Sequence, residues 1–278
     1  MVKVCVTGAS GKAGRATTEE LVSSGFDVVA VDLLAADLNV PLVRADLCDY
    51  GQTVEVLSQV DAVVHLANIP APGLHTPAVT FTKNTVMNSN VFLGAAQVGL
   101  QRVVWASSET TLGLPFDSPP LYVPIDEDHF PHPTTSYALS KVVGETLATH
   151  ISEWSGIPFI GLRLSNIHTV DDYEQVPGYW ADPMIRKWNL WGYVDARDAA
   201  AAFRLALEAP LAGARSFIVA AADTIMNRPS KELLKAVFPT VTLTREIAEF
   251  ETLLSIDAAR GSLGYEPRHS WRDHVAVN

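Results

Sequence analysis

Tyr137 and Lys141 have residue types and a spacing suited to proton transfer, and their segment, 134–154, has the pattern of a long helix. The i, i+4 spacing places both side chains on one face of that helix. A phenol ionises near pH 10, and lowering its pKa to about 7 takes about 4 kcal/mol. A neighbouring ammonium group and an oxidised nicotinamide both favour the phenolate. The pair therefore predicts a tyrosine acid/base, with a surface Tyr/Lys pair as the alternative.

A pair of serines, Ser107 and Ser108, lies at the end of a predicted strand that spans 102–107. Ligands of open α/β sheets bind at the carboxyl ends of the strands. A serine hydroxyl at that edge could hold a substrate oxygen toward Tyr137. Helix capping or turn formation is the alternative role for these serines.

The N-terminal segment predicts a dinucleotide site. An apolar strand at 2–7 runs into three glycines spaced by three, Gly8, Gly11 and Gly14, and a helical pattern follows at once. The glycines permit a tight turn, close approach of a ligand and close helix–strand packing, while the helix N-terminus attracts phosphate oxygens. An ordinary strand-to-helix turn is the alternative.

Asp32 ends the second predicted strand, 27–32, and indicates which dinucleotide binds. Its carboxylate can accept hydrogen bonds from a ribose 2′-hydroxyl and repels a 2′-phosphate. The sequence therefore favours NAD over NADP. Arg15 could reach a 2′-phosphate, or it could lie on the surface of the helix.

The amino-acid composition limits which classes of protein the sequence can belong to. The chain has 278 residues, a net charge of −11 and 48% hydrophobic residues, which allows a large core. Nucleic acids and anionic membrane surfaces require a basic face, and the sequence has no Lys/Arg cluster, so we expect neither partner. No Cys/His spacing suits a metal. Cys5 and Cys48 suggest buried thiols in a reducing compartment, so we expect a cytoplasmic protein without a membrane span.

Strand and helix patterns alternate along the chain and predict an α/β fold, a Rossmann-type doubly wound parallel sheet with a small C-terminal lobe. The predicted strands are 2–7, 27–32, 41–46, 61–67, 102–107, 158–164 and 215–220, and the long helices are 82–98 and 134–154. Segments 114–133 and 171–190 have a loop-like pattern. We expect a cofactor domain of residues 1–165, joined again by 191–221, and a substrate lobe of 166–190 and 222–278.

The order of these motifs resembles the extended short-chain dehydrogenases, the NAD-dependent epimerase/dehydratase family, over most of residues 1–200. Other matching segments are Asp46-Leu47, His65-Leu66-Ala67, the asparagine Asn84, the "LRxxN" segment 162–166 and the segment 193–198. In that family the two long helices form a four-helix interface. The resemblance therefore implies a homodimer through 82–98 and 134–154.

The resemblance also implies the roles of individual residues. Ser108 would be the catalytic hydroxyl, Tyr137 the acid/base, and Lys141 the group that tunes Tyr137 and binds the nicotinamide ribose. The residues implied around NAD are Gly8, Ser10, Gly11, Lys12, Ala13, Gly14, Asp32, Leu33, Asp46, Leu47, Leu66, Ala67, Asn68, Asn84, Ala106, Ser107, Tyr137 and Lys141. Those implied around the substrate are Ser108, Glu109, Thr110, Tyr137, Asn166 and Arg186.

The residues after Ser108 separate the reactions of this family. Its dehydratases have an Asp-Glu pair there, whereas this chain has Glu109 and Thr110, so we do not expect dehydration. The short lobe, and the segment after Asn166, argue against a substrate that carries a nucleotide diphosphate. In length and lobe the chain is similar to the compact uronate dehydrogenases of the family. Arg186 could bind a substrate carboxylate, or it could be solvated.

We therefore expect hydride transfer between NAD and a small polyhydroxylated substrate, a free sugar or sugar acid. The alternatives are a sugar epimerase with transient NAD reduction and a non-catalytic NAD-sensing regulator. His129 and His132 could line the cleft or lie in a solvated loop. Three tryptophans could stack on a sugar or pack in the core: Trp180, Trp188 and Trp191.

Overall fold

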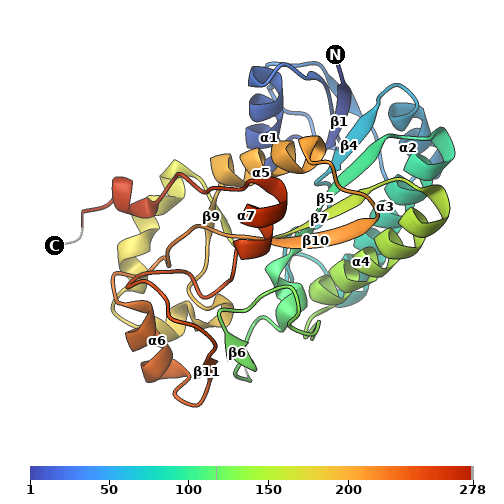
Figure 1. Ribbon diagram of the computed structural model, residues 1–278. Coiled ribbons are helices and arrows are strands. Elements are labelled where there is room, and N and C mark those ends of the chain that lie inside the picture. The colour runs from blue at the N-terminus through green and yellow to red at the C-terminus, as the bar shows by residue number, and fades with distance from the viewer. Residues whose placement is uncertain (117, 277–278) are drawn as a thin grey trace.

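The central sheet has seven parallel strands in the order β10-β7-β5-β4-β1-β2-β3, as seen in the computed structural model, which describes residues 1–116 and 118–276 (Figure 1). The strands are β1 (Lys3–Thr7), β2 (Asp27–Asp32), β3 (Leu42–Arg44), β4 (Ala62–His65), β5 (Arg102–Ser108), β7 (Phe159–Leu164) and β10 (Ala214–Val219). The chain order reverses between β1 and β4, and this switch point is where an open α/β sheet binds its ligand. The predicted α/β fold is confirmed.

Helices cover both faces of the sheet (Figure 1). Helices α1 (Lys12–Ser23) and α5 (Ala196–Glu208) pack together on one face. Helices α2 (Tyr50–Leu57), α3 (Pro77–Val98) and α4 (Ser136–Ser155) pack side by side on the other. Helix α3 begins five residues before the predicted 82, because its first buried positions, Thr80, Asn84 and Asn88, are polar and hide the apolar pattern.

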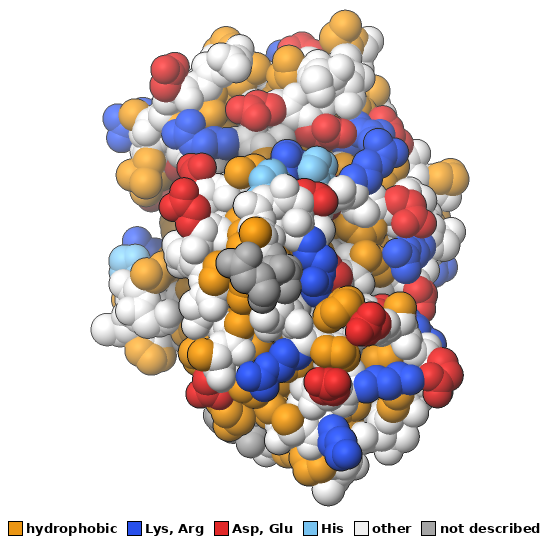
Figure 2. Space-filling model, turned by 90° about the vertical axis from the view of Figure 1, so that its left-hand side faces the viewer, with side chains coloured by type: hydrophobic (Ala, Val, Ile, Leu, Met, Phe, Trp, Pro, Cys, Tyr) orange, Lys and Arg blue, Asp and Glu red, His pale blue; other side chains and the backbone are white. Residues whose placement is uncertain are grey.

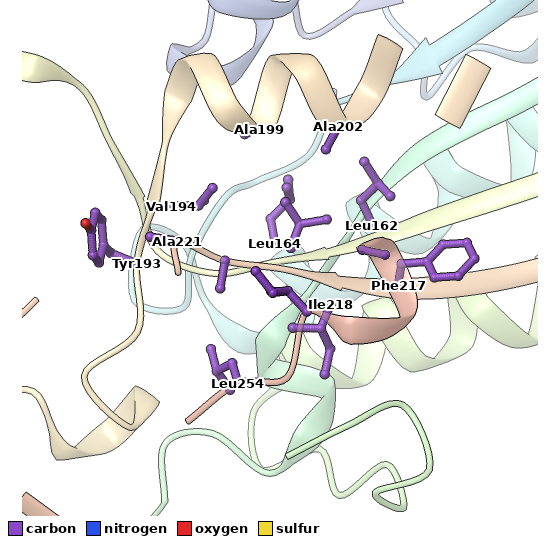
Figure 3. Close-up of a cluster of buried hydrophobic side chains, with 14 of the residues drawn as sticks. Leu162, Leu164, Tyr193, Val194, Ala199, Ala202, Phe217, Ile218, Ala221 and Leu254 are labelled. Atoms are coloured by element: carbon purple, nitrogen blue, oxygen red, sulfur yellow. The ribbon is translucent and has the colours of Figure 1, made fainter. Parts of the chain in front are cut away.

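Two hydrophobic cores follow from this layering. The first lies between the sheet, α1, α5 and the C-terminal segments; Figure 3 shows Leu162 and Leu164 of β7 on the side of the sheet toward Ala202 of α5. The second lies under α2, α3 and α4 around Phe92, Trp105 and Phe159. Because both faces are covered, β4, β5 and β7 are almost continuously apolar.

The small elements lie beyond the carboxyl edge of the sheet. Strand β8 (Ile167–His168) pairs with β9 (Val194–Asp195), and β6 (Tyr122–Val123) pairs with β11 (Thr242–Leu243). The helices here are α6 (Ser230–Val237) and α7 (Asp257–Leu263), with 3₁₀ helices η1 (Glu109–Leu112), η2 (Val170–Tyr179), η3 (Pro183–Ile185), η4 (Lys187–Asn189) and η5 (Trp271–Asp273).

Two segments expected to be loops are therefore partly regular. Segment 114–133 contains β6, and segment 171–190 consists largely of η2, η3 and η4. Elements of two or three residues are too short for a hydrophobic period to reveal. Trp191 is fully buried, whereas Trp180 and Trp188 only border the core.

The surface agrees with the composition. Figure 2 shows acidic and basic side chains interspersed on the face that carries the C-terminal segments. Among the described residues, no helix is long and apolar enough to cross a membrane. Both cysteines are free; Cys5 is buried, while Cys48 is partly exposed instead of buried as expected.

Candidate active site

The glycine turn packs against the chain that follows β4, and against itself, more closely than any side chain would allow. A Cβ atom on Gly8, whose φ is +67°, would lie 2.6 Å from the backbone nitrogen of Ala67, and one on Gly14 would lie 2.1 Å from the carbonyl oxygen of Gly8. Helix α1 begins after Gly11, which offers no side chain to cap the first N–H groups of Lys12 and Ala13. These free donors suit the two phosphates of a dinucleotide.

Asp32 lies beside this turn at the end of β2. Its carboxylate accepts hydrogen bonds from the backbone N–H groups of Ser10, at 2.9 Å, and Leu34, at 3.0 Å. A carboxylate offers about four acceptor positions, so Asp32 retains capacity for ribose hydroxyls. Leu33 is exposed next to it. Arg15 donates instead to the backbone oxygens of Ser10 and Asp37, each at 3.0 Å.

His65 joins the two strands that flank the switch point. Its Nδ1 lies 2.8 Å from Thr7 Oγ1, and its Nε2 lies 3.0 Å from Asn88 Oδ1. Burial lowers the pKa of His65 to about 3, so the ring is neutral. The hydroxyl of Thr7 also accepts hydrogen bonds from the N–H groups of Leu66 and Ala67. His65 therefore fixes the shape of the cofactor crevice.

The asparagines expected near the cofactor hold the chain after β4. Asn84 clamps the backbone of Ile69, accepting from its N–H at 2.8 Å and donating to its carbonyl at 3.1 Å. Asn68 donates to Asn88 Oδ1 at 3.1 Å. Near β3, Asp46 accepts from the backbone N–H of Cys48, and Leu47 is buried.

Ser108, Tyr137 and Lys141 come together at the carboxyl end of β5. The Lys141 ammonium donates to the carbonyl oxygen of Ala106 at 2.7 Å and lies 5.5 Å from the centre of the Tyr137 ring. The Ser108 hydroxyl accepts from the Thr110 backbone and hydroxyl at 3.2 and 3.0 Å, and it also hydrogen-bonds to the Tyr137 phenol. Strand β5 and helix α4 thus position the proposed proton-transfer group.

The electrostatics of this group are set mainly by burial. Burial raises the pKa of Tyr137 to about 12, the hydrogen bond from Ser108 lowers it, and the charge of Glu109 raises it further. Burial also lowers the pKa of Lys141 to about 7. A positively charged cofactor beside the phenol would favour its ionised form.

Ser107 points away from this group. Its hydroxyl donates to Glu145 Oε1 at 2.7 Å, and that carboxylate pairs with Arg163 at 2.9 Å. The ion pair is largely buried and ties α4 to β7. The geometry therefore agrees with Ser108, not Ser107, as the serine that faces Tyr137.

Glu109 is a buried carboxyl group directly after Ser108. Its two oxygens accept hydrogen bonds from Ser165 Oγ at 2.5 Å and Asn189 Nδ2 at 3.3 Å. Burial raises its pKa to about 7 despite these donors and the nearby charge of Arg186. Neither Ser165 nor Asn189 was expected at the site, because each is a single polar residue outside any periodic pattern.

Arg186 is buried close to Glu109 and is not solvated. Its two terminal nitrogens donate to Asn166 Oδ1 and to the carbonyl oxygen of Gly192, each at 3.1 Å. The rings of Tyr179 and Trp188 lie 5.1 and 5.0 Å from the guanidinium carbon. Of the two loop histidines, His129 is buried and His132 is exposed.

An ion pair links the glycine turn to the lobe. Lys12 Nζ lies 2.6 Å from Asp172 Oδ2 and 3.5 Å from the carbonyl oxygen of Ile167. Asp172 also accepts from the backbone and hydroxyl of Thr169 at the start of η2. The bond to Lys12 and those from Thr169 lower the pKa of Asp172 to about 2 although its partial burial raises it, so the pair persists at neutral pH.

The fold and these contacts define a dinucleotide-binding α/β enzyme. The sequence profile of the family described as "NAD dependent epimerase/dehydratase family" matches residues 4–220. This chain therefore belongs to the NAD-dependent epimerase/dehydratase family, and its cofactor is NAD.

Individual relatives differ in their reactions. The chain is 27% identical to a UDP-glucose 4-epimerase of Lacticaseibacillus casei, over 98% of this chain and 94% of the relative. It is 28% identical to an L-arabinose 1-dehydrogenase (NAD(P)(+)) of Haloferax volcanii, over 63% of this chain and 71% of the relative. A solved structure of a mutated uronate dehydrogenase has a TM-score of 0.72 at 22% identity, covering 98% of this chain and 85% of that one.

Proposed function

We propose that this enzyme transfers a hydride between NAD and a hydroxyl-bearing carbon of a small free sugar or sugar acid. The observation that carries the proposal is the convergence of Ser108, Tyr137 and Lys141 at the carboxyl end of β5. The similarity to an L-arabinose dehydrogenase supports a free sugar as the substrate class.

NAD, when bound, supplies the hydride acceptor. Ser108 orients the substrate oxygen, and Tyr137 as phenolate takes the hydroxyl proton while the substrate carbon loses its hydride and the carbonyl forms. Lys141, fixed by the Ala106 carbonyl, stabilises the phenolate. Glu109, Thr110, Asn166 and Arg186 surround the substrate in this proposal.

A substrate panel with NAD, followed by NADH absorbance, tests the proposal. We expect turnover of at least one aldose, uronate or polyol. Tyr137→Phe should lower kcat by about 10²-fold or more, because the proton acceptor is lost. Tyr50→Phe, at an exposed tyrosine of α2, is the matched control and should leave kcat unchanged. The absence of NADH with every substrate in the panel would contradict hydride transfer to free sugars.

A sugar epimerase is the second candidate, because the epimerase relative aligns over 94% of its length. Such an enzyme returns the hydride to the opposite face of the same substrate. It would invert a sugar carbon with no net NADH, which NMR of the product mixture detects. Inversion without NADH would select this candidate over the first.

We also propose that two copies associate through α3 and α4. Leu93 of α3 and Trp154 of α4 are exposed apolar side chains on the outer faces of these helices. Light scattering of the purified protein should give about twice the mass of one chain. Trp154→Glu should give a monomer, whereas Val22→Glu, at an exposed position of α1, should not.

A further inference from the structure

A buried polar cluster adjoins the proposed proton-transfer group and has unfilled hydrogen-bonding capacity. It consists of Glu109, Asn166, His168, Arg186 and Asn189, and of these only Asn166 is more than slightly exposed. Arg186 contacts Asn166 Oδ1 on one side and the Gly192 carbonyl on the other. Asn189 shares the Gly192 carbonyl, and His168 shares the Asn166 oxygen, so the cluster is continuous.

Three buried atoms of this cluster have no hydrogen-bond partner: Arg186 Nε, Asn189 Oδ1 and His168 Nδ1. Buried polar atoms are normally paired, and an unpaired one costs roughly 1–3 kcal/mol. Asn189 and His168 each share a hydrogen-bond acceptor with Arg186, so the three unpaired atoms belong to one connected cluster, and they indicate that it binds polar ligand groups.

The neighbours of each atom determine whether it is a hydrogen-bond donor or acceptor. Asn189 Nδ2 donates to two acceptors, the Gly192 carbonyl at 2.8 Å and Glu109 Oε1 at 3.3 Å, so Oδ1 is the free atom and is an acceptor. Because Arg186 can only donate, the Asn166 atom it contacts is the oxygen, and His168 Nε2, 2.9 Å from that oxygen, must carry the hydrogen. Burial and Arg186 lower the pKa of His168 to about 4, which leaves a neutral ring with Nδ1 as a second free acceptor.

A carboxylate does not match this set of one donor and two acceptors. It accepts from Arg186 Nε but cannot donate to Asn189 Oδ1 or His168 Nδ1, and it would lie near the carboxyl of Glu109. A hydroxyl group both accepts and donates. The terminal nitrogens of Arg186 are also already bonded to protein oxygens, so the bidentate fork that recognises a carboxylate is not free.

We propose that Arg186 Nε, Asn189 Oδ1 and His168 Nδ1 form a subsite for hydroxyl groups of the substrate end remote from Tyr137, which selects an uncharged polyhydroxy sugar over the corresponding sugar acid. This assignment rests on the proposed function and replaces the carboxylate that the sequence suggested for Arg186. His168 and Asn189 become substrate-binding residues, and Glu109 becomes a positioning residue that holds Asn189.

Calorimetric titration of the NADH-saturated enzyme tests the subsite without requiring turnover. The ligands are neutral aldoses and the uronates of the same configuration, for example galactose with galacturonate. We expect the neutral sugar to bind at least 10-fold more tightly. His168→Phe keeps the ring stacked on Tyr173 but removes Nδ1, and it should weaken neutral-sugar binding by about 10-fold. His150→Phe, on the exposed face of α4, should not.

A truncated ligand separates recognition from a structural effect. Glyceraldehyde lacks the remote hydroxyls, so His168→Phe should leave its binding unchanged. Tighter or equal binding of the uronate, or loss of glyceraldehyde binding together with aldose binding, would overturn the subsite. Equal aldose affinity in the wild type and His168→Phe would show that the unpartnered atoms hold only water, and would overturn it too. If sugars bind as expected but give no NADH, the subsite stands and the proposed hydride transfer fails.

Discussion

At the scale of single residues, the site holds three ionisable groups whose pKa values are displaced by burial: Tyr137, Lys141 and Glu109. Residue types and spacing, with the family resemblance, predicted that Ser108, Tyr137 and Lys141 act together, and the structure places the three side chains near one another. The same reasoning did not find Ser165, His168 or Asn189. Their roles arise from tertiary contacts with Glu109 and Arg186, which no local pattern encodes.

Glu109 should make the stability of the protein depend on pH. Its folded pKa, about 7, lies above its ordinary value of 4.5, so its contribution to stability is full below about pH 4.5 and is lost as the pH rises through 7. Melting temperatures measured from pH 5 to 8 should therefore fall less steeply for Glu109→Gln than for the wild type. Glu174→Gln, at an exposed position of η2, should reproduce the wild-type slope. Parallel slopes for wild type and Glu109→Gln would show that Glu109 titrates normally.

Glu109 should also influence catalysis through Tyr137. Its negative charge raises the pKa of the phenol, and this effect operates only above about pH 7, where Glu109 is ionised. In the proposed mechanism kcat/KM rises with pH as the Tyr137 phenol ionises. We expect this rise to occur at lower pH in Glu109→Gln than in the wild type. A profile that keeps its wild-type midpoint would argue against coupling between the two groups.

Asp32 should set the choice of cofactor. Asp32→Ala removes a charged acceptor, so we expect NAD to bind roughly 10-fold more weakly, equivalent to about 1.4 kcal/mol. We expect NADP to bind more tightly, because the carboxylate no longer repels its 2′-phosphate. Fluorescence titration with NADH and NADPH measures both. Asp37→Ala, at an exposed position on the same loop, provides the control and should change neither affinity.

At the scale of elements, the junction of β1 and α1 is the least tolerant part of the fold. A methyl group on Gly14 would lie 2.1 Å from Gly8 O and 2.7 Å from Ala9 Cα, and these backbone atoms cannot move independently. We expect Gly14→Ala to displace α1, to destabilise the protein by about 1–3 kcal/mol and to abolish NAD binding. Gly261→Ala in α7, where a Cβ would meet nothing within 4 Å, should be neutral or slightly stabilising. Urea unfolding and NADH titration of both variants test this.

The elements that were predictable from the sequence are those with a long, uniform hydrophobic pattern. Strands β1, β2, β4, β5 and β7 were found close to their true ends because both of their faces are buried. The start of α3 and the short pairings of β6 and β8 were not found. A polar buried face removes the apolar period, and a two-residue strand is defined by its partner across the fold.

At the scale of the whole molecule, the parallel sheet and its switch point follow from the β-α repetition, and the family profile over residues 4–220 agrees with them. The internal structure of the predicted lobe did not follow from this repetition. Strand β6 pairs with β11, and η2 and η3 pack on η5 and α6, so these segments are ordered by contacts with residues much later in the chain. For the same reason, the sequence could only propose residues around the substrate, while the hydrogen-bonding character of the proposed subsite required the assembled cluster.

We expect the ion pair between Lys12 and Asp172 to slow nucleotide exchange. It joins Lys12, at the start of α1 beside the glycine turn, to Asp172 of η2, so we expect the pair to hinder release of a nucleotide bound at that turn. A dehydrogenase must release NADH in every cycle, whereas an epimerase gains from a long residence time. We expect Asp172→Asn to raise the NADH dissociation rate severalfold in stopped-flow displacement. Thr169→Val, which removes the neighbouring hydroxyl bond but leaves the ion pair, should keep the wild-type rate. The strength of this one ion pair would then set the residence time of NADH on the enzyme.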